Sequence, residues 1–183
     1  MPLSDEQFSV LAREVFSGSG VELTRLSPAD APSLVDLNDS AYPAVPITSV
    51  DAMRSLLEFS DCAVAIKRDG QLVGFVVTLG DGAAYESENY QFFCSRGVSS
   101  RYVDRIVIAE SERGNGLGAA LYALVFSVAR AEGRAEVTCE VNLDPPNPAS
   151  LAFHERLGFA SVGTQATKGG TVTVSLLAAP VSA

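Results

Sequence analysis

The chain has 183 residues, of which 47% are hydrophobic, so it fits one domain with a sizeable core. Its 13 Lys and Arg are outnumbered by 22 Asp and Glu, and the net charge of -9 argues against binding nucleic acid or an anionic membrane surface. Trp is absent and there are only nine Phe and five Tyr, so aromatic platforms for stacking nucleobases are not indicated.

The first eighty residues predict helices and strands in alternation. Ser4 suits the N-cap of a first helix through Phe16, because Gln7 stands three residues later as in a capping box. A hairpin is predicted over 62–80, where Asp69-Gly70 joins two apolar runs. The other elements expected here are a hinge over 17–20, a strand over 21–26, a helix over 29–40, a proline-containing loop over 42–47 and a helix over 50–59 capped by Ser49.

The rest of the chain predicts a long loop followed by strands and helices in turn. Residues 81–100 are polar and lack a period, as in a loop that contains a short helix, and long loops in compact domains are often functional. A β-branched strand is expected over 101–110, and leucines at helical spacing predict a helix over 116–133. The elements expected after it are a strand over 135–142, a helix between an Asn147 N-cap and a Gly158 C-cap, and closing strands over 159–166 and 171–177.

These elements predict a single α/β domain, with a mixed sheet that carries helices on its faces. Residues 1–18 are expected to form an N-terminal helical extension and residues 19–183 the domain itself. The amphipathic first helix either caps the fold or pairs with a partner chain, as in a homodimer.

Cysteine usage and the N-terminal segment bear on location. Cys62, Cys94 and Cys139 match no zinc-binding spacing, so no metal site is expected, and an odd number of thiols fits a reducing compartment. The N-terminus has no basic stretch before an apolar run, and nothing approaches the roughly 18 apolar residues of a membrane span. A soluble, cytoplasmic protein without a membrane partner is expected.

The stretch "RGNGLG" (113–118) places three glycines between a strand and a helix. Such a loop aims free backbone N–H groups at the positive end of a helix, where phosphate binds. A P-loop requires Gly-Lys-Ser/Thr, but no lysine follows Gly118, and a Rossmann fingerprint requires the spacing G-x-G-x-x-G. Neither nucleotide motif fits, so the residues alone leave two alternatives, a phosphate cradle of another kind or a tight turn.

Two blocks of sequence together resemble the GNAT superfamily of N-acetyltransferases. The first is the loop, which matches that family's pattern Gln/Arg-x-x-Gly-x-Gly/Ala through Arg113, Gly116 and Gly118. The second is "NPASLAFHERLGF" (147–159), which is similar to the family's helix after its fifth strand. The resemblance spans 21–177 and implies a GNAT-like fold, in which the fourth and fifth strands splay apart to hold acetyl-CoA.

The resemblance also implies which residues hold the cofactor. Backbone N–H groups of the loop would bind the CoA pyrophosphate, backbone groups of the fourth strand would line the pantetheine arm, and polar side chains after the fifth strand would bond it. Asn147 equally suits an ordinary N-cap. The implied cofactor-binding residues are Arg113, Gly114, Asn115, Gly116, Leu117, Gly118, Ala119, Ile106, Val107, Ile108, Asn142, Asn147 and Ser150.

His154, the only histidine, stands where the family often has a tyrosine that protonates the departing thiolate. An imidazolium is a competent acid near neutral pH, because the unperturbed pKa of histidine is about 6.5. His154 is therefore expected to act as the general acid or to contact the region of the thioester sulfur. A structural role on its helix is the alternative to both.

Asp104 and Glu140 are the candidates for the base that takes the proton of the amine. Strict alternation along the fourth strand would place Asp104 on one face with Ile106 and Ile108. Asp104 next to Arg105 is also expected as a member of a surface ion pair.

The acceptor pocket is expected at the loop around Tyr42 and at the segment 81–100, where Tyr85 and nearby acidic residues would form a lid that attracts an amine. The implied activity is transfer of an acetyl group from acetyl-CoA to the primary amine of a small molecule or a protein N-terminus, by direct transfer in a ternary complex. The alternative is a non-catalytic acyl-CoA-binding or sensor module on the same fold.

Overall fold

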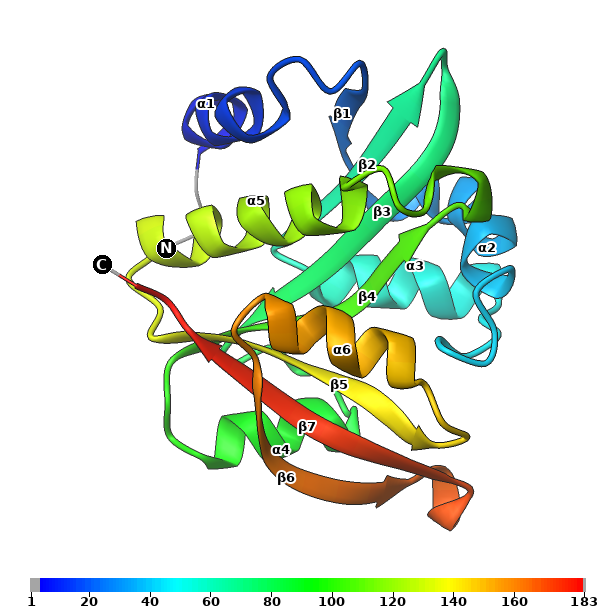
Figure 1. Ribbon diagram of the computed structural model, residues 1–183, viewed down its shortest axis with the longest axis vertical. Coiled ribbons are helices and arrows are strands. Elements are labelled where there is room, and N and C mark those ends of the chain that lie inside the picture. The colour runs from blue at the N-terminus through cyan, green and yellow to red at the C-terminus, as the bar shows by residue number, and fades with distance from the viewer. Residues whose placement is uncertain (1–3, 183) are drawn as a thin grey trace.

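A computed structural model describes residues 4–182, so Met1–Leu3 of the predicted extension and Ala183 lie outside the described residues. Within this range the chain forms one mixed sheet with helices on both faces, which confirms the predicted fold class (Figure 1). The helices are α1 (Asp5–Phe16), α2 (Ala31–Asp39), α3 (Val50–Phe59), α4 (Glu88–Ser95), α5 (Leu117–Ala131) and α6 (Pro148–Arg156). The strands are β1 (Glu22–Arg25), β2 (Cys62–Arg68), β3 (Gln71–Gly80), β4 (Ser100–Ile108), β5 (Glu136–Asp144), β6 (Ala160–Thr167) and β7 (Val172–Pro180).

Local side-chain chemistry sets the ends of several elements as predicted. Ser4 Oγ accepts from the Gln7 N–H at 3.2 Å while Gln7 Oε1 accepts from the Ser4 N–H at 3.0 Å, which confirms the capping box of α1. Asp69 and Gly70 both have positive φ, as a two-residue hairpin turn between β2 and β3 requires. The helix expected from residue 29 instead begins with a 3-10 turn over Pro28–Asp30.

The sheet has the strand order β1-β2-β3-β4-β5-β7-β6. Neighbouring strands are antiparallel except β4 and β5, which are parallel and pair only from Ser100 with Glu136 to Tyr102 with Thr138. Beyond those three pairs the two strands have no pairing, so they separate toward their carboxyl ends. The closing strand β7 lies between β5 and β6 and pairs along nearly all of β5.

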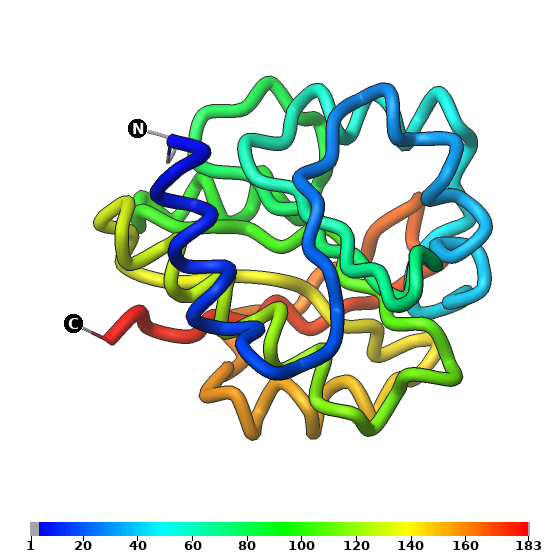
Figure 2. The backbone as a smooth tube through the Cα atoms, turned by 90° about the horizontal axis from the view of Figure 1, so that it is seen from above, coloured from blue at the N-terminus to red at the C-terminus, as the bar shows by residue number. Residues whose placement is uncertain are grey.

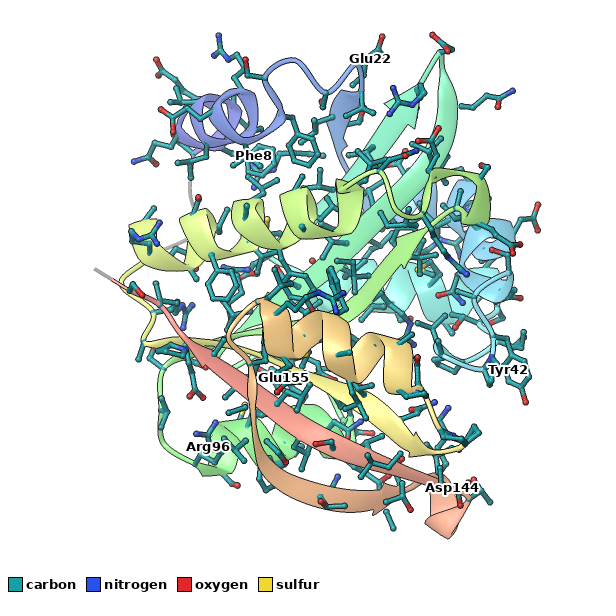
Figure 3. The ribbon with its side chains drawn as sticks, in the orientation of Figure 1. Phe8, Glu22, Tyr42, Arg96, Asp144 and Glu155 are labelled. Carbon is teal, nitrogen blue, oxygen red and sulfur yellow. The ribbon has the colours of Figure 1, made fainter. Side chains whose placement is uncertain are left out.

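Two cores cover the two faces of the sheet. The first lies under α1 and α5, and Phe8 points from α1 toward α5 in Figure 3. Seen from above, α1 lies over α5 (Figure 2), so the predicted extension shares the core of the domain. The second core lies under α2, α3 and α4 and includes Met53 and Phe75. The division of the chain at residue 18 stays a prediction.

Arg101 joins the end of the sheet at which β4 and β5 are still paired. Its guanidinium is fully buried, and it bonds Asp61 Oδ1 at 2.7 Å, Thr78 Oγ1 at 2.8 Å and the Glu132 carboxylate. Asp61 precedes β2 and Glu132 ends α5. One buried cation therefore ties β4 to β2, β3 and α5, next to the point at which β4 and β5 part.

Replacing this cation is expected to destabilise the fold strongly. Arg101→Met leaves the buried Glu132 with only its 3.4 Å contact to Arg134, and an uncompensated buried charge costs about 3–5 kcal/mol. Denaturant unfolding of Arg101→Met should show a loss in this range, and the double variant Arg101→Met/Glu132→Gln should recover part of it. Arg54→Met, which removes an exposed ion pair with Asp51, is the control and should change the free energy of unfolding by at most about 0.5 kcal/mol. Equal losses in Arg101→Met and Arg54→Met would contradict the account.

Candidate functional site

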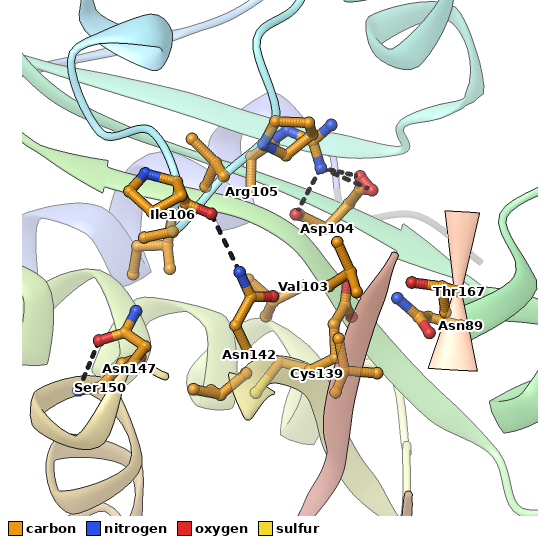
Figure 4. A pocket seen from close by; sticks show the side chains of 18 of the residues that line it. Asn89, Val103, Asp104, Arg105, Ile106, Cys139, Asn142, Asn147, Ser150 and Thr167 are labelled. Atoms are coloured by element: carbon orange, nitrogen blue, oxygen red, sulfur yellow. Dashed lines mark hydrogen bonds and ion pairs between the residues drawn. The ribbon is translucent and has the colours of Figure 1, made fainter. Parts of the chain in front are cut away.

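A cleft of about 530 Å³ opens where β4 and β5 separate (Figure 4). Residues 103–106 of β4 and residues 139–142 of β5 form two of its walls. Residues 42–46, after α2, close it on the face that carries α2, α3 and α4, and residues from α5 and α6 reach it from the other face. The cleft therefore passes through the sheet and is lined from both of its sides.

A β-bulge in β4 sets the direction of the Asp104 side chain. Val77 of β3 pairs with Arg105 and Thr78 pairs with Val103, so Asp104 is an extra residue in the ladder. Its carboxylate accepts from Tyr85 Oη at 2.9 Å and from Arg105 Nη1 at 2.8 Å. The expected ion pair between Asp104 and Arg105 is therefore present, but its expected place at the surface is wrong, because the Asp104 side chain is only 2% exposed.

The bulge also overturns the predicted alternation. Asp104 contacts Tyr85, which packs on the second core, whereas Ile106 and Ile108 pack on the first core. A strand with strict period two would have placed all three of these β4 side chains on one face. Asp104 is instead held beside Arg105 in the wall of the cleft, on the face that carries α4.

Glu140 faces the same cleft from β5. Its Oε2 accepts from Tyr102 Oη at 2.7 Å. Burial and, to a smaller extent, the negative charge of Asp104 together raise the pKa of Glu140 to about 7, against the opposing effects of Tyr102, Asn89 and Arg105. The two carboxylates that the sequence analysis singled out therefore meet at one cleft, and Glu140 is poised to exchange a proton near neutral pH.

His154 of α6 is buried at the side of the cleft that faces α5. Its Nδ1 lies 2.7 Å from the Ser150 carbonyl oxygen, which can only accept, so Nδ1 carries the hydrogen. Its Nε2 lies 2.7 Å from Tyr122 Oη. Burial lowers the pKa of His154, which favours the neutral ring, and the Tyr122 hydroxyl then donates to Nε2. The imidazolium acid expected from the sequence is disfavoured by this burial.

Tyr122 is a residue that sequence reasoning missed. It lies on α5 among the apolar residues of that helix and is fully buried, while its hydroxyl reaches the wall of the cleft. Burial raises the pKa of the Tyr122 phenol well above its usual value, so the hydroxyl keeps its proton. The available signal was a tyrosine in an otherwise apolar helix, because a buried hydroxyl requires a polar partner.

The glycine loop lies outside the cleft, at the start of α5. Gly114 and Gly116 have φ of +82° and +79°, and a Cβ at either position would meet nothing within 4 Å. Glycine is therefore required there by the backbone conformation, and the space in front of the loop is open. Within residues 4–182, the first α5 amide to find a backbone acceptor is that of Ala120, which bonds the Gly116 carbonyl at 2.9 Å.

The other residues of the loop bond within the loop or pack behind it. Arg113 Nε donates to the Ile108 carbonyl at 3.4 Å, and Asn115 Nδ2 donates to Glu112 at 3.3 Å. A Cβ on Gly118 would lie 3.4 Å from Phe153 Cζ, so that glycine lets α5 approach α6 closely. Leu117 is buried in the first core, Ala119 is exposed, and Val107 packs in the second core.

The three polar residues predicted to bond the cofactor, one near the end of β5 and two after it, each have a partner in the chain. Asn142 Nδ2 donates to the Pro43 carbonyl at 3.0 Å, and so bridges β5 to the loop after α2 (Figure 4). Asn147 Oδ1 accepts from the Ser150 N–H at 3.2 Å, which confirms its role as N-cap of α6. Tyr42 lies at the rim of the cleft and is 64% exposed. The predicted site residues that meet in the cleft are Tyr42, Tyr85, Asp104, Ile106, Glu140, Asn142, Asn147, Ser150 and His154. The residues of the glycine loop, Val107 and Ile108 are not among those that line it.

Comparisons with known proteins add the following. Residues 31–159 match the model of the acetyltransferase (GNAT) family. No match is found among curated protein sequences. None of the described helices is both long and apolar enough to cross a membrane.

Three solved structures illustrate the likeness in fold. The ribosomal-protein-S18-alanine N-acetyltransferase of Escherichia coli superposes with a TM-score of 0.67 at 19% identity, over 89% of this chain and 95% of that one. Ard1 of Thermoplasma volcanium gives 0.69 at 17%, over 90% and 99%. An acetyltransferase from Salmonella typhimurium, described with its cofactor acetyl-CoA, gives 0.64 at 14%, over 89% and 95%. At identities this low, the superpositions establish a shared fold and nothing more.

The state of His154 can be measured directly, because it is the only histidine in the chain. Nitrogen-15 NMR should show a neutral ring protonated on Nδ1 at pH 7, with a titration midpoint below the usual value of about 6.5. In Tyr122→Phe the midpoint should rise, because the donor that stabilises the neutral ring is gone. A ring already charged at pH 7, or one protonated on Nε2, would contradict the hydrogen bonds described.

Proposed function

Because the chain belongs to the acetyltransferase (GNAT) family, we propose that it transfers an acetyl group from acetyl-CoA to the primary amine of a small-molecule or peptide acceptor. The observation that carries this proposal is the cleft between β4 and β5. It holds a carboxylate whose pKa lies near neutrality, and it opens beside a glycine loop at the start of a helix, where the amides of residues 114–119 have no hydrogen-bond acceptor within residues 4–182.

The chain fits acetyl-CoA in two respects. The open space in front of Gly114 and Gly116, at the positive end of the 15-residue α5, suits a pyrophosphate bound by backbone N–H groups from Gly114 to Ala119. The Arg113 N–H already donates to the Glu110 carbonyl at 3.2 Å. Past Tyr102 the edge of β4 that faces β5 has no strand pairing, although the other edge stays paired with β3. Backbone groups of residues 106–108 that point to the open edge are therefore available to an extended ligand. Asn147 and Ser150 border the same space. Acetyl-CoA would supply the activated acetyl thioester and leave as the free thiol.

Glu140 is the base in this proposal. An acceptor amine is charged at neutral pH and must lose a proton before its nitrogen can act as a nucleophile. A carboxylate with a pKa of about 7 is basic enough to take that proton and is still half ionised at neutral pH. Asp104 is already bonded to Arg105 and Tyr85, so its contribution is the negative charge that helps to raise the pKa of Glu140.

Tyr122 and His154 act together on the opposite wall. Burial keeps the Tyr122 hydroxyl protonated, and its one hydrogen is donated to Nε2 of His154. To protonate a leaving thiolate, the hydroxyl would turn this hydrogen from Nε2 into the cleft. Ser150 in turn fixes the tautomer of His154 through its carbonyl. The contribution of His154 is therefore to hold the Tyr122 hydroxyl in place at the cleft.

The acceptor enters from the face that carries α2, α3 and α4. Tyr42 lies at the rim of the cleft on that face, and Tyr85 lies beside Asp104 inside it. The cofactor loop belongs to the other face, because α5 packs on the first core. Acceptor and cofactor thus approach the gap between β4 and β5 from opposite sides, which orients the two reactants for direct transfer.

The role of Glu140 is tested by substitution and by pH. In thiol release from acetyl-CoA over an amine panel, Glu140→Gln should lower kcat/KM about a hundredfold or more. The wild-type rate should rise with pH through about 7, because Glu140 accepts a proton only after it has lost its own, and the variant should lose this limb. Glu155→Gln, on the outward face of α6 in Figure 3, removes the same charge away from the cleft and should keep both rate and pH profile.

Acetyl-CoA binding, measured by calorimetry, separates this proposal from the alternatives. Wild type and Glu140→Gln should bind acetyl-CoA equally well, since Glu140 acts on the acceptor. Binding without thiol release for any amine would favour a non-catalytic acyl-CoA module. Stabilisation of the fold by ATP and not by CoA would contradict the proposal that acetyl-CoA is the cofactor.

A further inference from the structure

The acceptor side of the cleft carries two cationic side chains, Arg105 and Lys168, in addition to the carboxylates. Arg105 lies on β4 beside Asp104, and Lys168 lies in the turn between β6 and β7. Arg105 is linked to Tyr85, which precedes α4, through the carboxylate of Asp104 that both residues bond. The Lys168 N–H donates to Oε2 of Glu88, the first residue of α4, at 3.1 Å. Both cations therefore belong to the face from which the acceptor enters.

The guanidinium of Arg105 is only partly used by the protein. Its hydrogen bonds to residues 4–182 all leave from Nη1, to the Asp104 carbonyl at 2.9 Å and to the Asp104 carboxylate at 2.8 and 3.2 Å. Its Nε is buried and has no partner among those residues. A buried charged donor without a partner is costly, so the Nε–Nη2 edge calls for a ligand. That edge matches the two oxygens of a carboxylate.

Lys168 is a second cationic residue among those that line the cleft. Its backbone is fixed with φ at +52°, and its carbonyl accepts from the Thr171 hydroxyl at 2.9 Å. The ammonium group itself makes no ion pair with any residue of the described chain. A lysine held by its backbone while its charge stays unpaired adds positive potential at the opening of the cleft.

We propose that the acceptor is a small primary amine that carries a carboxylate, as an amino acid does, and that Arg105 and Lys168 bind this carboxylate while Glu140 faces the amine. This inference rests on the proposed acetyl transfer and specifies its acceptor. The volume of about 530 Å³ supports a small acceptor, because the same cleft has to admit the acetyl end of the cofactor. The two cations complement the carboxylate, a group that a simple amine lacks.

The test compares each amino acid with its own amide, over small, apolar and acidic side chains, by thiol release from acetyl-CoA. For the preferred side chain, the acid should exceed its amide by about tenfold or more in kcat/KM, chiefly through KM. At neutral pH a larger fraction of the amide than of the acid has an uncharged amino group. Without a carboxylate site, the amide would therefore be the better substrate. An amide that equals its acid, or a peptide N-terminus that exceeds both, would overturn the proposal.

Variants assign the preference to the two cations. Lys168→Gln should lower the ratio of acid to amide several-fold, whereas Lys168→Arg should retain most of it. Lys67→Gln removes the other lysine of the chain, which lies on β2 away from the cleft, and should leave the ratio unchanged. Asp104→Asn/Arg105→Gln removes the buried pair without leaving a charge, and should bring the ratio close to one. Thermal unfolding checks that each variant is folded.

Failure of this inference is distinguishable from failure of the proposed function. If amides and acids are acetylated equally well, acetyl transfer stands and the carboxylate site falls. If no amine releases thiol, acetyl transfer falls, and the carboxylate site is decided by calorimetry on the CoA-saturated protein with N-acetylglycine and its amide. Tighter binding of the acid, weakened in Lys168→Gln, would support the site, and equal binding would overturn it.

Discussion

The separation of β4 and β5 is the constraint on which the rest of the molecule depends. Parallel pairing lasts for three residue pairs, up to Tyr102 and Thr138, and the two strands then part. Arg101 holds the paired end, where it ties β4 to β2, β3 and α5 through buried ion pairs and hydrogen bonds. The bulge at Asp104 follows directly and turns a carboxylate into the gap that the parting creates.

The connections after these two strands then supply the chemistry. β4 continues through the glycine loop into α5, which places a helix N-terminus on one face of the sheet. β5 continues into α6, whose N-cap Asn147 and buried His154 border the same gap. The opposite face contributes the loop after α2 and the segment before α4. A cleft that passes through a sheet thereby gives cofactor and acceptor separate entrances.

Features that depend on neighbours in the sequence were predictable, and those that depend on distant pairing were not. The cap at Ser4 and the turn at Asp69-Gly70 follow from residues a few positions apart. The bulge at Asp104 depends on the register with β3, and the bond between Tyr122 and His154 joins residues 32 positions apart. The pKa values of Glu140 and His154 reflect burial, which no motif encodes.

The central claim is that the α5 loop and the open edge of β4 hold CoA, and an NMR titration of nitrogen-15-labelled protein with CoA tests it most directly. Backbone amide signals of Gly114, Gly116, Gly118 and residues 106–108 should shift and saturate together, whereas Gly70, in the β2–β3 turn, should not move. Saturable shifts confined to other parts of the chain, or the same loop shifts produced by ATP with higher affinity than by CoA, would contradict the account.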